Sequence, residues 1–291
     1  MASTQLLKRR VRSVSNTKQI TKAMELVAAA KMRRVAEAAQ KSRAYADASA
    51  SILLRLSKTP EAAQHPYFSP ASGRPKLHVI FTSDSGLAGA YNANIFNAAA
   101  RAFNEEKNSV KPAVVVFGRK GAHHFSRGTN IDLLGTYEKV EDAPDMNVFA
   151  PVLNTIIDGF NEAQFSSLYV IFTQSVSTLV QQVKVLQLLP VPVDADASAE
   201  KTAGPPVAYE LEPDGNAVLD SALRLYFESS LRRARVEAAA SEHAMRMVSM
   251  GNATRNATDL IDSLTLELNA TRQAAITQEV AEIIGGAEAI A

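Results

Sequence analysis

The residues that could do chemistry are few, and the most suggestive group follows one apolar run. The loop from Ser83 to Gly89 combines a carboxylate, hydroxyl groups and glycines, and it comes directly after the β-branched run at residues 77–82. Loops at the carboxyl ends of parallel strands often bind phosphate groups. This loop, however, has neither the Gly-x-Gly-x-x-Gly spacing nor the lysine of a Walker loop. The pattern therefore favours a tight strand-to-helix turn over a nucleotide site.

No other residues form a recognisable catalytic or metal-binding arrangement. The sequence has no cysteine, which excludes thiolate metal sites, cysteine nucleophiles and disulfides. His123 and His124 are adjacent, so on a helix their side chains would diverge by about 100° and a packing or surface role is favoured. His65, His78 and His243 are isolated in the sequence. We therefore predict no catalytic residue, no metal site and no cofactor site.

The distribution of proline and glycine indicates the elements that must position any functional residue. All twelve prolines lie between Pro60 and Pro213. Residues 1–59 contain neither residue type, and residues 216–284 contain one glycine, Gly251. Because proline and glycine interrupt regular structure most strongly, both ends predict helices several times longer than the average of about 11–12 residues.

Both ends also place small or apolar residues at alternating steps of four and three, which is typical of a left-handed coiled coil. The N-terminal seam comprises Leu7, Val11, Val14, Lys18, Thr21, Glu25, Ala28, Met32, Val35, Ala39, Ser42, Ala46, Ser49, Leu53 and Leu56. The C-terminal seam comprises Met247, Met250, Thr254, Ala257, Ile261, Leu264, Leu268, Thr271 and Ala275. Because the seams are rich in alanine, the two helices can approach each other closely.

The net charge of +1 hides an asymmetry between the ends of the chain. Residues 1–58 carry a net charge of +10, residues 59–213 carry −5, and residues 214–291 carry −4. A basic helix and an acidic helix can pair in antiparallel fashion. A basic helix could instead bind nucleic acid, but Tyr45 is its only aromatic residue, so a stacking platform for single strands is missing. No apolar run approaches the roughly 20 residues of a membrane span.

The middle of the chain alternates strand and helix patterns. Strands are expected at residues 77–82, 113–117, 131–134, 168–173 and 176–189, and helices at 93–107, 121–126 and 148–162. This alternation predicts a Rossmann-like, mainly parallel α/β domain. We expect three segments: a coiled-coil helix at 1–59, an α/β domain at 60–213 with an exposed connection at 190–213, and a coiled-coil helix and tip at 214–291. Segments 1–59 and 214–291 would form one discontinuous unit.

Several segments resemble the γ subunit of F-type ATP synthases. Ser13–Met32 is similar to that family's N-terminal helix, Asp84–Gly89 to its central motif and Arg272–Ala289 to its C-terminal signature. Ala88 is a departure, since many members have cysteine there. The resemblance extends over essentially the whole chain and includes residues 188–190 and 209–213. The signature positions are Ile276, Thr277, Glu279, Glu282, Gly286 and Ala287.

The resemblance implies the central shaft of a rotary motor with no catalytic activity of its own. Its implied partners are a ring of three α and three β subunits, the ε subunit and the membrane ring of c subunits, with one shaft in each complex. Proton or sodium flow would turn the shaft. The family motifs further imply that Arg272 and Gln273 contact a β-subunit catch loop. They also place Met24 and Lys22 near the β-subunit lever, with Arg246 close to Met24.

Other interpretations remain open from the residues alone. For Arg246 and Lys22 the alternative is a solvated helix face, and for Met24 it is ordinary seam packing. For the whole chain the alternatives are a non-rotary coiled-coil scaffold, a nucleic-acid-binding protein and a stand-alone α/β enzyme. No presequence precedes the family match, so we expect a peripheral protein on the cytoplasmic face of the bacterial inner membrane, with the mitochondrial matrix side as the alternative.

Overall fold

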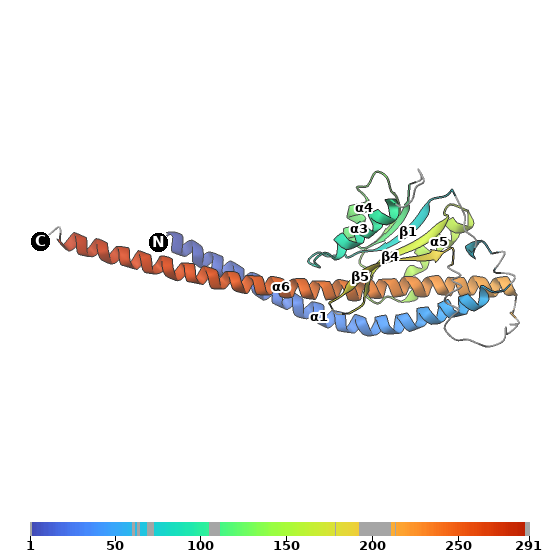
Figure 1. The fold of residues 1–291 in the computed structure, drawn as a ribbon, viewed down its shortest axis with the longest axis horizontal. Helices are drawn as coiled ribbons and strands as arrows, with labels where there is room; N and C mark the ends of the chain where they lie inside the picture. Colours follow the sequence, from blue (N-terminus) through green and yellow to red (C-terminus); the bar gives the residue numbers. More distant parts are fainter. Residues whose placement is uncertain are drawn as a thin grey trace. The chain divides into compact units, whose positions relative to one another are not determined.

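The computed structural model describes residues 2–59, 62, 65–68, 73–104, 111–177, 179–191, 211–212 and 214–288 (Figure 1). The chain divides into two compact units. The helical unit comprises residues 1–29 and 246–291, and the sheet unit comprises residues 30–245. The division falls within the two long helices, so each unit contains a segment of both. The three-segment organisation expected from composition stays a prediction.

Two long helices form the ends of the chain, as the sequence predicts. Helix α1 spans Ala2–Leu56 and helix α6 spans Gly215–Glu288, with 55 and 74 residues. Asp214 precedes α6, and its Oδ1 accepts a hydrogen bond of 3.0 Å from the Ala217 backbone N–H. This contact satisfies one of the free N–H groups at the helix start. Neither helix contains a proline, so no residue of that type interrupts either helix between its ends.

The helices pair along the predicted seams in antiparallel orientation. Every seam residue predicted from the sequence is buried or half-buried. In the helical unit, the Thr254 hydroxyl lies 2.9 Å from that of Thr21. In the sheet unit, the hydroxyl oxygens of Ser49 and Ser229 lie 2.6 Å apart. Within each unit, contacts later in α1 thus match positions earlier in α6, as an antiparallel pair requires.

The sheet unit contains five strands in the order β3-β2-β1-β4-β5. They are β1 Lys76–Phe81, β2 Ala113–Phe117, β3 Asp132–Tyr137, β4 Ser167–Ser175 and β5 Gln181–Leu189. The first four are parallel to their neighbours, and β5 pairs antiparallel with β4. The predicted mainly parallel sheet is therefore confirmed. The expected strand start at residue 176 is wrong, because the backbone N–H groups of Val176 and Ser177 both donate to the Val180 carbonyl and form the β4–β5 turn.

Helices cover both faces of this sheet. On one face, strand residues such as Val79 pack in a core with α5 (Ala150–Asn161), α1 and α6. On the other, Ile80 packs in a second core with α3 (Tyr91–Asn104) and α4 (Arg119–Phe125). Burial on both faces explains why the strands read as continuous apolar runs. Two short 3-10 helices, Pro66–Phe68 (η1) and Met146–Phe149 (η2), complete the described elements. Most of the expected connection at 190–213, and residues 105–107 of the expected helix, lie outside the described residues.

Candidate functional site

All five contact residues predicted by resemblance belong to the helical unit: Lys22, Met24, Arg246, Arg272 and Gln273. Lys22 and Met24 come from α1, and the other three come from α6. The structure therefore places the predicted contact residues on one pair of helices.

Lys22 and Met24 have different environments although they are two residues apart. The Lys22 ammonium lies 3.2 Å from both carboxylate oxygens of Glu25, and its side chain is exposed. Glu25 faces α6 at Gly251, where a Cβ would lie 3.5 Å from the carboxyl carbon of Glu25. Met24 is half-buried. An exposed ion pair contributes only about 0–1 kcal/mol to stability, so the Lys22–Glu25 pair leaves the ammonium free to exchange partners.

Arg246 is buried, with 8% of its surface exposed. The alternative that it lies on a solvated helix face is therefore wrong. It follows a stretch of α6, Ala234–Ala244, in which every residue is buried. Burial of a guanidinium requires compensating polar contacts, so this side chain is held by its own chain. Its proximity to Met24 stays a prediction.

Arg272 lines a groove between the start of α1 and the distal part of α6. The groove residues are Thr4, Lys8, Leu268, Asn269, Arg272, Ala275, Ile276 and Glu279. The structure thus brings Arg272 together with the signature residues Ile276 and Glu279, and it adds the ammonium of Lys8 from α1. Gln273 is exposed and lies outside this group.

The signature residues outside the groove lie on the distal part of α6. Every residue from Ile276 to Gly285 is exposed, and Ala287 is exposed as well. Thr277 is exposed, and the Glu282 carboxylate accepts a hydrogen bond of 2.9 Å from the Gln278 side chain. Gly286 lies within the helix.

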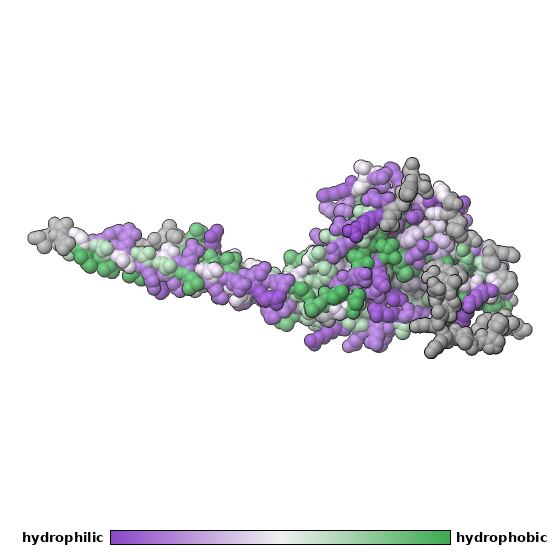
Figure 2. All heavy atoms as spheres, viewed as in Figure 1, coloured by the Kyte–Doolittle hydropathy of each residue, from purple (hydrophilic) through white to green (hydrophobic). Residues whose placement is uncertain are grey.

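Large aliphatic side chains are exposed on this same segment of α6. The exposed fractions are 53% for Ile276, 49% for Val280, 71% for Ile283 and 59% for Ile284. Figure 2 shows hydrophobic residues along the C-terminal end of α6. Exposed large apolar patches mark interaction surfaces. This tip, residues 276–288, is therefore a candidate interaction surface.

The Ser83–Gly89 loop forms the predicted tight turn. The Asp84 carboxylate accepts a hydrogen bond of 3.0 Å from the Arg119 backbone N–H and one of 3.1 Å from that of Lys139. These residues follow β2 and β3, so one carboxylate connects the loops after three neighbouring strands. Sequence reasoning missed this role, for which the available signal was an aspartate placed soon after a buried strand.

Two buried charge clusters were also missed. His243, expected to be isolated, contacts Asp142 Oδ2 through its Nε2 at 2.8 Å, and this hydrogen bond holds the pKa of the Asp142 carboxyl below its usual range. Arg235 donates to the Val140 carbonyl at 2.6 Å and so ties the loop after β3 to α6. The other cluster centres on Glu237, which is fully buried. Both join residues far apart in sequence, so periodicity carried no signal for them.

The structure also bears on the predicted role of His124, on metal-binding groups and on membrane-spanning helices. The His124 ring stacks on that of Phe96 at 3.9 Å between centroids, which confirms the packing role. Within the described residues, no group of three or more histidine or acidic side chains could hold a metal ion. In the same residues, no helix has a stretch that is both long and apolar enough to traverse a bilayer.

Comparisons with known proteins give one consistent family. A family model described as ATP synthase matches residues 3–290. The ATP synthase gamma chain of Desulforamulus reducens is 39% identical over 290 residues, with 100% of both chains covered. That of Heliobacterium modesticaldum is 38% identical over 290 residues, with 98% of both covered.

Solved structures show the same fold at lower identity. One is the central stalk and c-ring of the Tetrahymena thermophila mitochondrial ATP synthase, at 24% identity and a TM-score of 0.63, covering 80% of this chain and 99% of that chain. Another is from the Euglena gracilis mitochondrial ATP synthase, at 18% identity and a TM-score of 0.67, covering 99% and 95%. Since the family model and the gamma chains match nearly the whole sequence, the chain belongs to the γ subunits of F-type ATP synthases.

Proposed function

We infer that this chain is the central rotor shaft of an F-type ATP synthase, and that it transmits torque between the ion-driven c-ring and the catalytic β subunits. The observation that carries this conclusion is the full-length match to γ chains. The chain would be non-catalytic by itself, because the chemistry belongs to the β subunits. The scaffold alternative is not favoured, since it accounts for neither the family match nor the exposed signature tip.

The architecture suits this role for a physical reason. A single asymmetric shaft presents a different face to each subunit of the ring that surrounds it. A ligand shifts a conformational equilibrium only by its difference in affinity for the states. Each catalytic subunit that meets a different face of the shaft would therefore favour a different state, and rotation would change the state of each in turn.

The finer contacts belong to this proposal. We place Arg272 and Gln273 against a β-subunit catch loop, and Lys22 and Met24 near the β-subunit lever. The exposure of Lys22, Arg272 and Gln273 supports contact with other chains. For Arg246, which its own chain buries, a role behind the contact surface agrees better with its environment. The partners would be one ring of three α and three β subunits, one ε subunit and one c-ring per shaft.

The energy that passes through the shaft bears on how the contacts share the load. One charge that crosses 100 mV releases about 2.3 kcal/mol, so several ions per step supply on the order of 10 kcal/mol. An exposed ion pair contributes about 0–1 kcal/mol. We therefore propose that torque is distributed over many contacts. The expected location is the cytoplasmic face of the bacterial inner membrane, where the shaft would be peripheral.

The decisive experiment is reconstitution with the cognate α and β subunits. ATP hydrolysis is measured with and without this chain, after gel filtration to establish complex formation. We expect a stable complex and a large rise in turnover. A variant ending at Ala275 is the matched control, because it removes the exposed tip and leaves the predicted seam. If the full chain forms no complex with properly folded partners, the rotor function is contradicted and the scaffold alternative gains support.

A further inference from the structure

The helix pair in the sheet unit has an interface of small residues around one buried charge. Val35 and Ala39 of α1 pack against Val236, Ala239 and Ala240 of α6. Such side chains differ little in size from one heptad to the next. Packing of a seam of this kind therefore discriminates weakly between the observed alignment of the helices and one displaced by seven residues.

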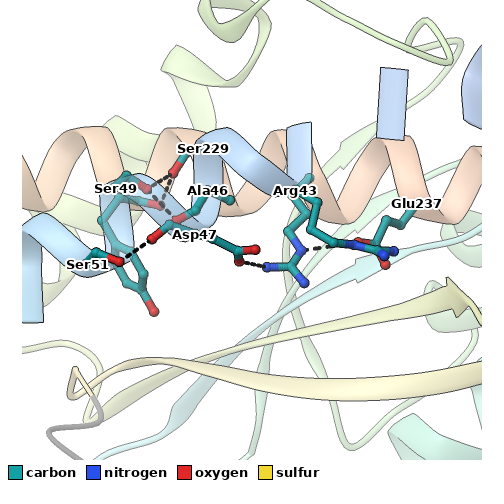
Figure 3. Close-up of polar contacts among 9 residues, drawn as sticks. Arg43, Ala46, Asp47, Ser49, Ser51, Ser229 and Glu237 are labelled. Carbon is teal, nitrogen blue, oxygen red and sulfur yellow. Dashed lines mark hydrogen bonds and ion pairs between the residues drawn. The ribbon is translucent and has the colours of Figure 1, made fainter. Parts of the chain in front are cut away.

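Glu237 differs from these small apolar residues, because it is charged and buried. It is 0% exposed, and its Oε1 accepts hydrogen bonds from two guanidinium groups. The Arg43 Nε, on α1, lies 3.1 Å away, and the Arg233 Nε, one turn earlier on α6, also lies 3.1 Å away. Glu237 Oε2 is buried and has no hydrogen-bond partner among the described residues. The guanidinium groups of the two arginines therefore offset the cost of burying this carboxylate. Figure 3 shows Arg43 beside Glu237.

Further polar contacts cross between the helices close to Glu237. Arg233 Nη1 donates to Asp47 Oδ1 at 2.8 Å, so this arginine connects both helices. The hydroxyl groups of Ser49 and Ser229 lie 2.6 Å apart (Figure 3). All these contacts specify the same alignment of α1 with α6.

A displacement of α1 by one heptad would put small residues in place of small residues, as for Ala39 and Ala46, but would remove the ion pair. Arg43 would leave Glu237, and the residue facing Glu237 would become Ala36 or Ala50. Neither alanine can neutralise a carboxylate. Leaving a buried charge without one of its partners is strongly unfavourable, whereas replacing a whole buried cluster by apolar residues is often neutral or stabilising. Such a cluster therefore affects alignment more than it affects stability.

We propose that Glu237, held by Arg43 and Arg233, is the register pin of the coiled coil, and that it keeps α1 from sliding along α6. Buried polar residues set register in other coiled coils. The inference goes beyond the proposed function, but it explains how a shaft whose helices meet through small residues in this region could carry torque without slip between its helices. Its test measures helix register directly and does not depend on rotation.

Disulfide reporters in the full chain test the proposal, because the native sequence has no cysteine. The observed register is reported by S49C/S229C, since the two hydroxyl oxygens lie within 2.6 Å. Slips of seven residues in the two directions are reported by S49C/A222C and A46C/A239C. In the observed register these pairs are offset by about 10 Å along the helix, beyond the Cα separation of up to about 7 Å that a disulfide tolerates. Linked peptides are quantified by mass spectrometry after mild oxidation.

The reporters are compared in three backgrounds: the parent chain, R43M/R233M/E237L, and the control R224M/E228L. The control removes an ion pair of the same length, 3.1 Å, that joins two residues of α6 one turn apart. We expect only S49C/S229C to link in the parent and the control. In R43M/R233M/E237L we expect the slipped products to rise roughly tenfold, within the range of couplings between contacting charges, while resistance to urea is kept.

A purely structural role for the cluster predicts a different result. It would lower the urea midpoint of R43M/R233M/E237L and leave the slipped products at the parent level, and this outcome would overturn the proposal. An equal rise in R224M/E228L would overturn it too. If R43M/R233M/E237L does not fold, the E237Q substitution is tested in the same reporter chains. This substitution keeps the shape of the side chain and removes its charge. An unchanged ratio of slipped to native product in E237Q contradicts the register pin.

Discussion

Helix α6 has opposite environments in the two units that it connects. In the sheet unit every residue from Ala234 to Ala244 is buried, whereas in the helical unit every residue from Ile276 to Gly285 is exposed. The first segment is held by a sheet and by α1, and its charged residues are paired internally. In the second, the described residues leave every position exposed, and α1 reaches only the groove at Ile276 and Glu279. Tertiary packing within the chain therefore stabilises one end of this helix. At the other end the local sequence must favour the helix, and its exposed side chains are left for a partner to cover.

The polar contacts between the helices differ in the same way. In the sheet unit, the cross-helix contacts include ion pairs, among them that of the buried Glu237 carboxylate with Arg43, beside the Ser49–Ser229 hydroxyl pair. In the helical unit, a hydroxyl pair joins Thr254 to Thr21, and the Lys22–Glu25 ion pair stays on one helix. Ion pairs thus cross between the helices in the sheet unit, whereas in the helical unit the exposed Lys22 ammonium is paired only along its own helix.

The largest expected effect comes from removing a buried side chain where α6 packs against the sheet. Phe227 is 0% exposed in the core between α6 and the sheet. Phe227→Ala should lower the free energy of unfolding by about 3–5 kcal/mol, since it removes a buried ring and leaves a cavity. Ile283→Ala, on the exposed tip, should change it by less than about 0.5 kcal/mol. Urea denaturation of both variants measures the difference, and equal losses would contradict the contrast between the two ends.

A helix breaker in the helical unit should have the next largest effect. Ala257 is a buried seam residue of α6. Ala257→Pro removes one backbone hydrogen bond and introduces a steric clash, at a cost of about 3 kcal/mol or more. Hydrogen exchange should show loss of protection around residue 257 and unchanged protection in strands β1–β4. Normal coupling of ATP hydrolysis to ion pumping in this variant would contradict the continuous-shaft interpretation.

A smaller effect should depend on pH and should be confined to the sheet unit. The His243 hydrogen bond lowers the pKa of Asp142 in the folded state. Asp142 therefore contributes stability above the unfolded value of about 3.9, and this contribution is lost as the pH falls through the lower folded value. Asp142→Asn should destabilise by about 1 kcal/mol at pH 7. The difference between the parent and this variant in urea should shrink on acidification below about pH 4, and a difference that grows instead would contradict the assignment.

The smallest effect is expected for single contacts on the exposed surface. Arg272 is exposed and lines the groove near the start of α1. Arg272→Ala should leave unfolding within about 0.5 kcal/mol of the parent and should reduce torque only partly, because the load is distributed. Single-molecule rotation with a bead on the sheet unit measures torque. Complete loss of torque with intact assembly would show that one contact carries the load. Gln273→Ala is the matched control, since it alters a neighbouring exposed side chain outside the groove.

Much of the fold followed from the sequence for physical reasons. Long stretches with helical periodicity and no proline favour long uninterrupted helices, and strands buried on both faces are continuously apolar. The start of β5 was missed because Val176, Leu179 and Val180 are apolar and yet exposed in a turn, with exposed fractions of 61%, 79% and 56%. Hydrophobicity alone could not distinguish this turn from a strand.

Less of the candidate site could be predicted from the sequence. The contact residues came from resemblance to a family, since single charged residues on a long helix look alike in sequence. The burial of Glu237 depends on pairing with Arg43, far away along the chain, and local patterns treat charged residues such as Glu237 and Arg246 as solvated. The contact between Arg43 and Glu237 spans 194 residues, so only the tertiary structure could reveal it.

The Asp84 carboxylate has a mechanical consequence for the sheet unit. Its two oxygens bind backbone N–H groups of Arg119 and Lys139, so the loops after β1, β2 and β3 are fastened at one point. A push on any one loop is therefore shared by all three and passes to the strands behind them. The three loops should therefore move together rather than one at a time, and Asp84→Ala should let each of them move independently.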